Sequence, residues 1–288
     1  MTDTIPADPF LITGPALISF SGGRTSAYML WRILQAHGGA LPEDVVVAFA
    51  NTGKEREETL RFVNECGSRW GVYVHWLEWR DAKPCFEPVS FDAASRNGEP
   101  LAALIGKKGY LPNAVTRFCT LEAKVRVMRD FCLSLGWKKW SNVVGLLYDE
   151  GHRVLKAIDR NHTGKERWTT VMPLSKGRIT VRDVAAFWRE QPFDLGLKHY
   201  EGNCDLCFLK GRGSLKAIMR ERPGASEWWS AQEQTVTSKR ATSAGARFVT
   251  EYSYADLQRE VDQQPHLFDD LPDEEHDAEC GLWCGEAA

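Results

Sequence analysis

The amino-acid sequence predicts an α/β protein with a parallel β-sheet between two layers of helices. Apolar runs at residues 16–20, 44–50 and 72–77 are separated by segments with helical spacing, which is the pattern of parallel β-α-β units with right-handed crossovers. The second run is continuously apolar, as is typical of a strand buried on both faces. Further strands are expected at residues 141–147 and 171–174. The result is a three-layer α/β/α fold with five parallel strands.

The segments between these strands carry the signals of helices. In the first, apolar residues repeat at helical spacing from Ala27 to Leu34, and Gly38 follows as a stop signal. A second helix is expected to end near Cys66 and a third near Leu135. These helices supply the layers that cover the predicted sheet.

The order of these signals along the chain predicts one large domain with an appendage. Residues 1–14 are interpreted as a flexible lead-in, and residues 15–200 as the main domain. Within it, residues 80–116 are rich in Pro, Gly and charge, which favours an excursion or lid that carries a few short elements. A Cys-containing helical appendage is predicted at residues 201–261, followed by an acidic tail at residues 262–288.

Composition narrows the class of protein. With 288 residues and 43% hydrophobic content the chain can bury a full core, and its net charge of −3 makes no general case for nucleic-acid binding. No apolar run is long enough for a membrane helix, and the N-terminus does not resemble a signal peptide. Eight cysteines without an export signal indicate thiol, metal or redox chemistry in the cytoplasm.

Small and hydroxyl-bearing residues gather where the first strand meets the first helix. From Ser19 to Ser26 the sequence reads Ser-Phe-Ser-Gly-Gly-Arg-Thr-Ser. Glycines let the backbone approach a ligand closely, and a helix N-terminus offers N–H donors and a partial positive charge. The segment matches neither the Walker A motif nor the dinucleotide-binding glycine pattern. It predicts a loop that holds phosphate or sulfate, and the alternative is an ordinary glycine-rich turn.

Polar residues also follow the second and fourth predicted strands. Asn51-Thr52-Gly53 could bind a base or ribose, although a helix-capping turn uses the same residue types. Asp149 and Arg153 are expected at the same edge of the sheet, where ligands of such folds bind. Carboxylates beside a phosphate need a cation to offset repulsion, so Mg²⁺ is a candidate cofactor.

Two groups of cysteines are the remaining chemical signal. Cys204-x-x-Cys207 places two thiols on a tight turn, which suits zinc, an iron–sulfur cluster or a redox dithiol. Cys119 opens a helix that also carries Lys124, and Cys280 and Cys284 lie in the tail. From the residues alone, a cluster, zinc and thiols without metal all stay open.

Taken in order, these motifs resemble the phosphoadenosine phosphosulfate (PAPS) reductase and related sulfotransferase family, which belongs to the PP-loop adenine-nucleotide alpha-hydrolase-like superfamily. The first loop is similar to the PP-loop, although Arg24 stands where many members have Lys and Thr25 where many have Asp. The resemblance implies a HUP-like fold that binds ATP or a PAPS-type nucleotide. The implied nucleotide-binding residues are Ser19, Ser21, Gly22, Gly23, Arg24, Thr25, Ser26, Asn51, Thr52, Gly53, Lys124 and Gly145.

The resemblance also implies roles for the cysteines. Glu-Cys-Gly-Leu around Cys280 resembles the tail that carries the nucleophile of the reductases, with Trp283 in place of His. The segment from Cys119 is similar to that of iron–sulfur members, except that Thr120 replaces a second Cys. The implied catalytic residues are Cys280, Arg24, Asp149 and Arg153. The implied ligands of a [4Fe–4S] cluster are Cys119, Cys204 and Cys207, with Cys284 or Cys280 as the fourth.

The expected function is therefore enzymatic sulfur chemistry on an adenine nucleotide. Either Cys280 reduces a PAPS-type substrate, or ATP adenylates an acceptor that then receives sulfur, with a thiol or electron-donor protein as partner. An alternative is a sulfur-inserting component of nucleic-acid modification, which resembles the ATPases of DNA phosphorothioation. Another is a nucleotide-binding module without catalysis. The nucleic-acid alternative needs a basic face, for which the candidates are Lys107, Lys108, Lys138, Lys139, Lys210 and Arg212.

Overall fold

A computed structural model describes residues 8–237 and 246–263. The chain divides into two compact units. The first comprises the residues up to Ala50, Glu58–Leu77 and Met128–Leu195. The second comprises Asn51–Glu57, Glu78–Val127 and the described residues from Gly196 onward.

The central element is a six-stranded, mostly parallel sheet with the strand order β4-β3-β2-β1-β5-β6. Strand β1 pairs in parallel with β2 on one side and β5 on the other, and β5 pairs in parallel with β6. The chain thus proceeds to one side of β1 until β4 and then returns to its other side, so the strand order reverses between β1 and β5. The strands are β1 (Ala16–Ser19), β2 (Val45–Asn51), β3 (Val74–Trp79), β4 (Phe86–Val89), β5 (Trp140–Val143) and β6 (Trp168–Val171).

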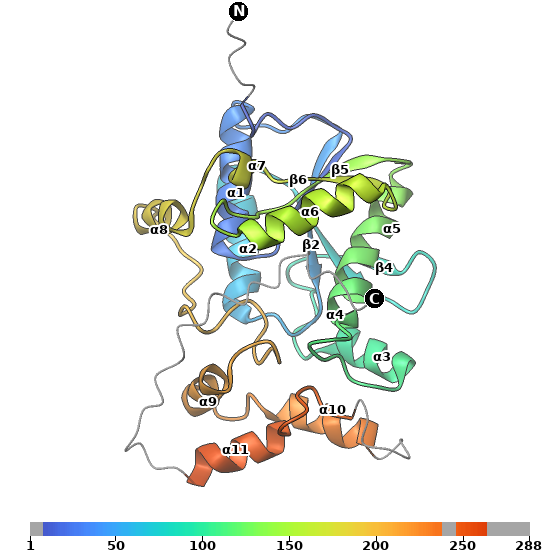
Figure 1. Ribbon diagram of the computed structural model, residues 1–288, viewed down its shortest axis with the longest axis vertical. Coiled ribbons are helices and arrows are strands. Elements are labelled where there is room, and N and C mark those ends of the chain that lie inside the picture. Colours follow the sequence, from blue (N-terminus) through green and yellow to red (C-terminus); the bar gives the residue numbers. More distant parts are fainter. Residues whose placement is uncertain (1–7, 238–245, 264–288) are drawn as a thin grey trace, which may run out of the picture. The chain divides into compact units, whose positions relative to one another are not determined.

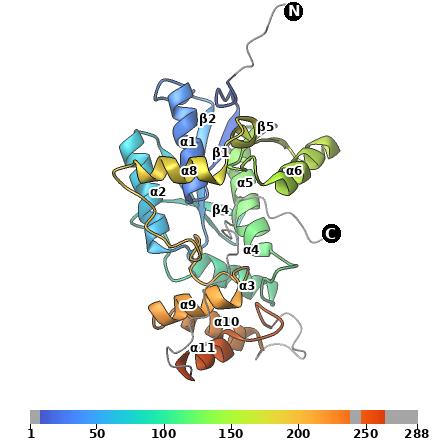
Figure 2. The same cartoon turned by 60° about the vertical axis from the view of Figure 1, so that its left-hand side comes forward.

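Helices flank this sheet on both faces in the first unit, as the sequence predicts. Figure 2 shows α1, α2 and α8 on one side of β1 and β2, with α5 and α6 on the other. Rings from α1, α2 and α8 pack together: Phe187 lies 4.9 Å from Tyr28 and Trp188 lies 5.0 Å from Phe62, centre to centre. These helices and the short α7 are α1 (Arg24–Ala36), α2 (Glu57–Trp70), α5 (Val127–Ser134), α6 (Gly151–Thr163), α7 (Pro173–Lys176) and α8 (Val181–Arg189).

The second unit is mainly helical around a small aromatic core. Trp229 stacks on Tyr254 at 5.3 Å, and Phe248 lies 4.8 Å from Trp229. The hydroxyl of Tyr254 donates to the carbonyl of Leu206 at 2.6 Å, which fastens this core to the segment that carries Cys204 and Cys207. Its helices, visible in Figure 1, are α3 (Glu99–Lys108), α4 (Phe118–Thr120), the π-helix η1 (Leu121–Arg126), α9 (Arg212–Glu221), α10 (Glu227–Thr237) and α11 (Tyr254–Gln263).

Two expectations about the strands are wrong. The sheet has six strands rather than five, because one of the short elements expected in residues 80–116, β4 at Phe86–Val89, joins the sheet. Pro88 argues against a strand in the sequence, but proline is tolerated at the edge of a sheet, where β4 lies. The last strand, β6, ends at Val171 instead of beginning there, since Pro173 starts helix α7, a position that proline favours.

Local features of the chain also fix the second half of the structure. Thr180 and Asp183 form a capping box at the start of α8: the hydroxyl and the amide of Thr180 donate to Asp183 Oδ2 at 2.6 and 2.8 Å. Trp229 is buried. In the described ranges, no helix combines the length and apolar character needed to cross a membrane.

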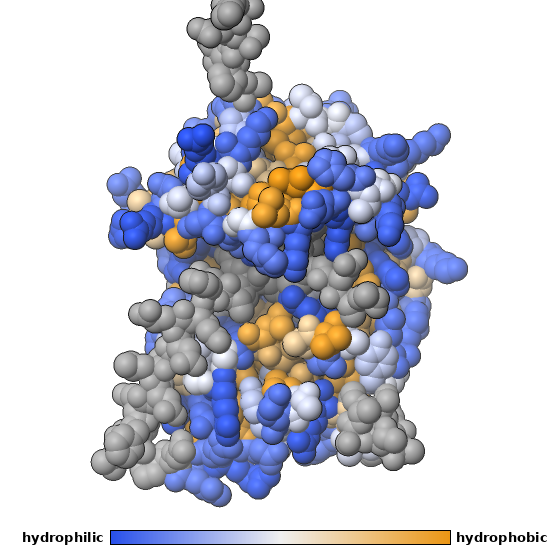
Figure 3. Space-filling model, viewed as in Figure 1, coloured by the Kyte–Doolittle hydropathy of each residue, from blue (hydrophilic) through white to orange (hydrophobic). Residues whose placement is uncertain are grey.

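Helix α6 leaves much of its apolar surface open to solvent. Only Ala157 of this helix is buried, whereas Leu155 and Ile158 are exposed. Figure 3 shows apolar surface on the face where Figure 1 draws α6.

Gly22 at the end of β1 is predicted to tolerate no side chain. Its φ is +83°, and an added Cβ would lie 2.6 Å from Thr59 Cγ2. Gly22→Ala should lower the free energy of unfolding by about 2–4 kcal/mol, because left-handed strain and overpacking add. Gly38 is the matched control: its φ is +68° but its Cβ would meet nothing within 4 Å, so Gly38→Ala should cost only the strain, about 1–2 kcal/mol. Urea denaturation measures both, and equal losses would contradict the packing account.

Candidate functional site

The loop between β1 and α1 adopts the geometry of an anion site. Gly22 has a left-handed backbone that packs against Phe49, Thr59 and Val63, and Gly23 is the N-cap of α1. As a glycine, the N-cap has no side chain with which to satisfy the first N–H groups of the helix, and the first turn contains no acidic residue. The positive end of α1 therefore receives no side-chain cap from residue 23 and no acidic side chain from its own first turn.

The hydroxyls of this loop are ordered by contacts within it. Ser21 Oγ and Ser26 Oγ lie 2.9 Å apart, and Ser26 Oγ donates to the carbonyl of Gly23 at 3.0 Å. Ser19 is buried and its hydroxyl donates to Asn142 Oδ1 on β5 at 2.7 Å. Ser19 thus joins two strands below the loop, whereas Ser21 is half-buried at its rim.

Gly145 lies against the first turn of α1. It follows β5, the strand beside β1, at the point where the strand order reverses. A Cβ on Gly145 would be 3.4 Å from Ser26 Cα and 3.5 Å from Ser26 N. The structure therefore brings Gly145 and the predicted residues Gly22 to Ser26 together, at the sheet edge where α/β folds bind ligands.

Arg24, the first residue of α1, lies in a two-pronged ion pair. Its Nε and one terminal nitrogen are 2.7 and 2.5 Å from the two carboxylate oxygens of Asp194. The indole N–H of Trp188 donates to the carbonyl of Arg24 at 3.0 Å. Sequence reasoning missed Asp194, because nothing in the local sequence connects it to a residue so distant along the chain.

The predicted catalytic residues Asp149 and Arg153 make structural contacts. Asp149 accepts a hydrogen bond from the first amide of α8, at Val181, at 3.2 Å. Glu150 accepts the amide of Leu147 at 2.8 Å and pairs with Arg153. These contacts close the turn that leads from β5 to α6.

Asn51 and Thr52, predicted to bind a base or ribose, are occupied internally in the second unit. The Asn51 side-chain amide donates to Glu78 Oε1 at 2.6 Å and to the carbonyl of Ser95 at 2.8 Å, while its oxygen accepts the amide of Gly53. Thr52 donates through both its amide and its hydroxyl to Glu55 Oε2 at 2.8 Å. These contacts are those of the alternative interpretation of this segment, a helix-capping turn.

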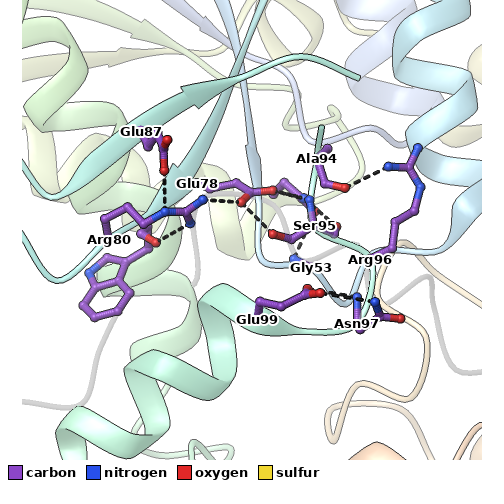
Figure 4. Close-up of polar contacts among 11 residues, drawn as sticks. Gly53, Glu78, Arg80, Glu87, Ala94, Ser95, Arg96, Asn97 and Glu99 are labelled. Carbon is purple, nitrogen blue, oxygen red and sulfur yellow. Dashed lines mark hydrogen bonds and ion pairs between the residues drawn. The ribbon is translucent and has the colours of Figure 1, made fainter. Parts of the chain in front are cut away.

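Glu78 is a buried carboxylate that organises the loop ahead of α3. Besides Asn51, it accepts the amide and hydroxyl of Ser95 at 2.6 and 2.7 Å and a guanidinium N–H of Arg80 at 3.0 Å (Figure 4). Arg80 is held from its other side by Glu87 of β4. A charged residue at the end of an apolar strand was the signal that could have identified Glu78.

A second buried carboxylate, Glu55, joins the predicted residues of the second unit. Lys124 Nζ lies 3.0 Å from Glu55 Oε1, and the thiol of Cys204 donates to the same oxygen at 3.8 Å. Lys124 comes from η1, and π-helical turns frequently mark functional positions. Glu55 therefore brings Thr52, Lys124 and Cys204 together around one charge.

The residue before Glu55, Lys54, also contacts the turn that carries Cys204. Its ammonium is 2.7 Å from Asp205 Oδ2 and 4.9 Å from the ring centre of Trp228. The amide of Asp205 donates to the carbonyl of Lys54 at 2.9 Å, and Lys210 Nζ donates to the carbonyl of Cys204 at 2.5 Å. The turn is thus held by backbone and by charge.

The cysteines occupy different environments. Cys119 and Cys204 are half-buried and Cys207 is buried. Across residues 8–237 and 246–263, no three His, Cys, Asp or Glu side chains are grouped as metal ligands. Cys280 and Cys284 lie outside the described residues.

Two of the three remaining described cysteines are packed as small hydrophobic residues. Cys66 and Cys132 are fully buried, and burial raises the pKa of the Cys66 thiol far above its usual range and that of Cys132 to about 12. Cys85 differs, because it is only half-buried.

Three of the six lysines and arginines proposed for a basic face form ion pairs within the second unit. Lys107 pairs with Asp81 and Lys108 with Glu122, while Arg212 pairs with Glu260. These partners offset the positive charge that phosphate binding would need.

Comparison with known proteins finds a distant relative. An uncharacterized nin region protein, ORF290, of Escherichia phage lambda is 28% identical over 218 residues, an alignment that covers 72% of this chain and 70% of the relative. No protein-family model matches the chain.

Glu55 is predicted to be a polar residue on which the stability of the second unit depends. Glu55→Gln should lower the free energy of unfolding by about 3–5 kcal/mol, because it leaves the buried Lys124 ammonium without its counter-charge. Glu57→Gln is the control: Glu57 is exposed and pairs with Arg96 at the surface, so its loss should cost less than about 1 kcal/mol. Chemical denaturation compares the two, and a small effect of Glu55→Gln would contradict the assigned role.

Proposed function

We propose that this chain is an enzyme that binds an adenine nucleotide at the first turn of α1 and uses it in sulfur chemistry. The observation that carries the proposal is the N-terminus of α1, which has a glycine as its N-cap and is lined by Gly22, Gly23 and Gly145 where the strand order reverses. Phosphate groups are the ligands that such a terminus favours. The order of motifs that resemble the PAPS reductase family supports an adenine nucleotide over other phosphates.

The residues of the loop suggest how it would act. Backbone N–H groups of the first turn and the Ser21 hydroxyl would bind phosphate oxygens, and Arg24 would add a full positive charge. In one version an acceptor oxygen attacks the α-phosphorus of ATP and pyrophosphate leaves with the bonding electrons. A nucleophilic sulfur supplied by a thiol-bearing donor then attacks the adenylated carbon or phosphorus of the acceptor, and AMP leaves with the bonding electrons. In the other version, the thiolate of Cys280 attacks the sulfur of a PAPS-type substrate, the bond from sulfur to the phosphate oxygen breaks, and the adenosine phosphate leaves. A thiol of the electron-donor partner then attacks Sγ of the sulfonated cysteine, which forms a disulfide and releases sulfite.

Neither version of the reaction includes a step that involves Mg²⁺ or the iron–sulfur cluster expected from the sequence. Asp149 and Glu150 are the carboxylates that could hold Mg²⁺, but each already accepts a backbone N–H. The Cys204 thiol lies 3.8 Å from Glu55 Oε1, and the described cysteines provide no group of three ligands. The [4Fe–4S] cluster stays a prediction, which metal analysis after anaerobic purification tests.

The decisive experiment is to incubate the chain with ATP or PAPS and to follow pyrophosphate, sulfite and nucleotide products. Pyrophosphate release supports adenylation, and sulfite release supports reduction. Binding without turnover would favour the non-catalytic alternative, and no binding of either nucleotide would overturn the proposal. The nucleic-acid partner and the cytoplasmic location stay predictions.

Gly145→Ala tests the site without disturbing the fold. The added methyl group fits at van der Waals distance but lies against the amide of Ser26. ATP affinity should fall about 10- to 100-fold, the equivalent of one charge-assisted hydrogen bond.

Isothermal calorimetry measures this affinity, with Gly151→Ala as the matched control. The Cβ of residue 151 would meet nothing within 4 Å, so its affinity and melting temperature should stay unchanged. Equal ATP affinities for the two variants would place the nucleotide elsewhere.

A further inference from the structure

We propose that Asp194 determines the affinity of the nucleotide site by competing with the phosphate for Arg24. This inference rests on the proposed function, since it concerns the same loop. It assigns to Asp194 a positioning role: the carboxylate acts on the ligand through Arg24 rather than by touching it.

The geometry of the pair makes Asp194 a substitute for a phosphate. Its two oxygens occupy the two-pronged donor edge of the Arg24 guanidinium, at 2.7 and 2.5 Å. Phosphate uses the same edge in the same bidentate manner. A phosphate that takes both donors must therefore displace the carboxylate.

Packing holds Asp194 in place for this exchange. The preceding residue, Phe193, packs against Phe62, Trp70 and Trp188, with ring centres 5.6–6.0 Å apart, and Arg69 lies over its other side at 4.8 Å. Trp188 in turn donates to the carbonyl of Arg24. The carboxylate thus belongs to an ordered segment that is fixed to the first turn of α1.

Exposure and charge make the exchange feasible. The side chains of Arg24 and Asp194 are 32% and 38% exposed, so water weakens their attraction and the pair contributes little stability. A nucleotide with several negative charges also gains from the positive end of α1, where the first turn has no acidic residue of its own. A nucleotide phosphate can therefore displace Asp194 from Arg24, but breaking this ion pair lowers the affinity for the nucleotide.

The test is a double-mutant cycle on ATP binding measured by calorimetry. Asp194→Asn should tighten binding about two- to fivefold, since it removes a competitor worth one surface ion pair. Arg24→Gln should weaken binding about tenfold or more. In the Arg24→Gln background, Asp194→Asn should have no effect, because the competition requires the guanidinium.

A control variant and melting temperatures show whether a change in ATP affinity is specific to Asp194. Glu190→Gln removes an exposed negative charge from the end of α8 and should leave ATP affinity unchanged. Melting temperatures of all variants should agree within a few degrees, so that changes in affinity report on binding and not on folding.

The outcomes separate this inference from the proposed function. If the unaltered chain binds ATP but Asp194→Asn leaves the affinity unchanged or lowers it, the inference is overturned alone. It is likewise overturned if Asp194→Asn tightens binding equally with and without Arg24, since this indicates plain charge repulsion. Failure of the unaltered chain to bind ATP overturns the proposed function and this inference with it.

Discussion

The close approach of neighbouring segments to the first turn of α1 is the constraint on which the candidate site depends. Gly22 turns the chain out of β1 in a conformation that side chains disfavour and in a space that Phe49, Thr59 and Val63 fill. Gly145 reaches the same turn from β5, near enough for its absent side chain to matter. Because the capping position is also a glycine, the turn keeps its positive end uncovered by its own side chains.

This part of the fold could be predicted because its signals are local. An apolar strand, a run of small residues and an amphipathic helix follow one another within about twenty residues, and their physical preferences agree. Strand β4 could not be predicted in the same way. Its four residues include Pro88, and they become a strand only because the edge of the sheet accepts a segment that local preference would reject.

The candidate site shows the same division between local and distant information. Asn51 and Thr52 have the residue types of a ligand site and of a capping turn, and the sequence alone leaves the two equivalent. The choice is made by Glu78 and Glu55, whose buried oxygens take up the available donors. Asp194 is a further example, since its relation to Arg24 arises only when α8 packs on α1.

The surroundings of Cys204 bear on the question of sulfur chemistry. Its thiol contacts the carboxylate of Glu55, which also pairs with Lys124. Burying a carboxylate charge is costly unless hydrogen bonds or an opposite charge compensate for the lost water. Metal binding would need the thiolate, and therefore a second negative charge beside Glu55. A cluster ligated by Cys204 would therefore require the contact between this thiol and Glu55 to be replaced.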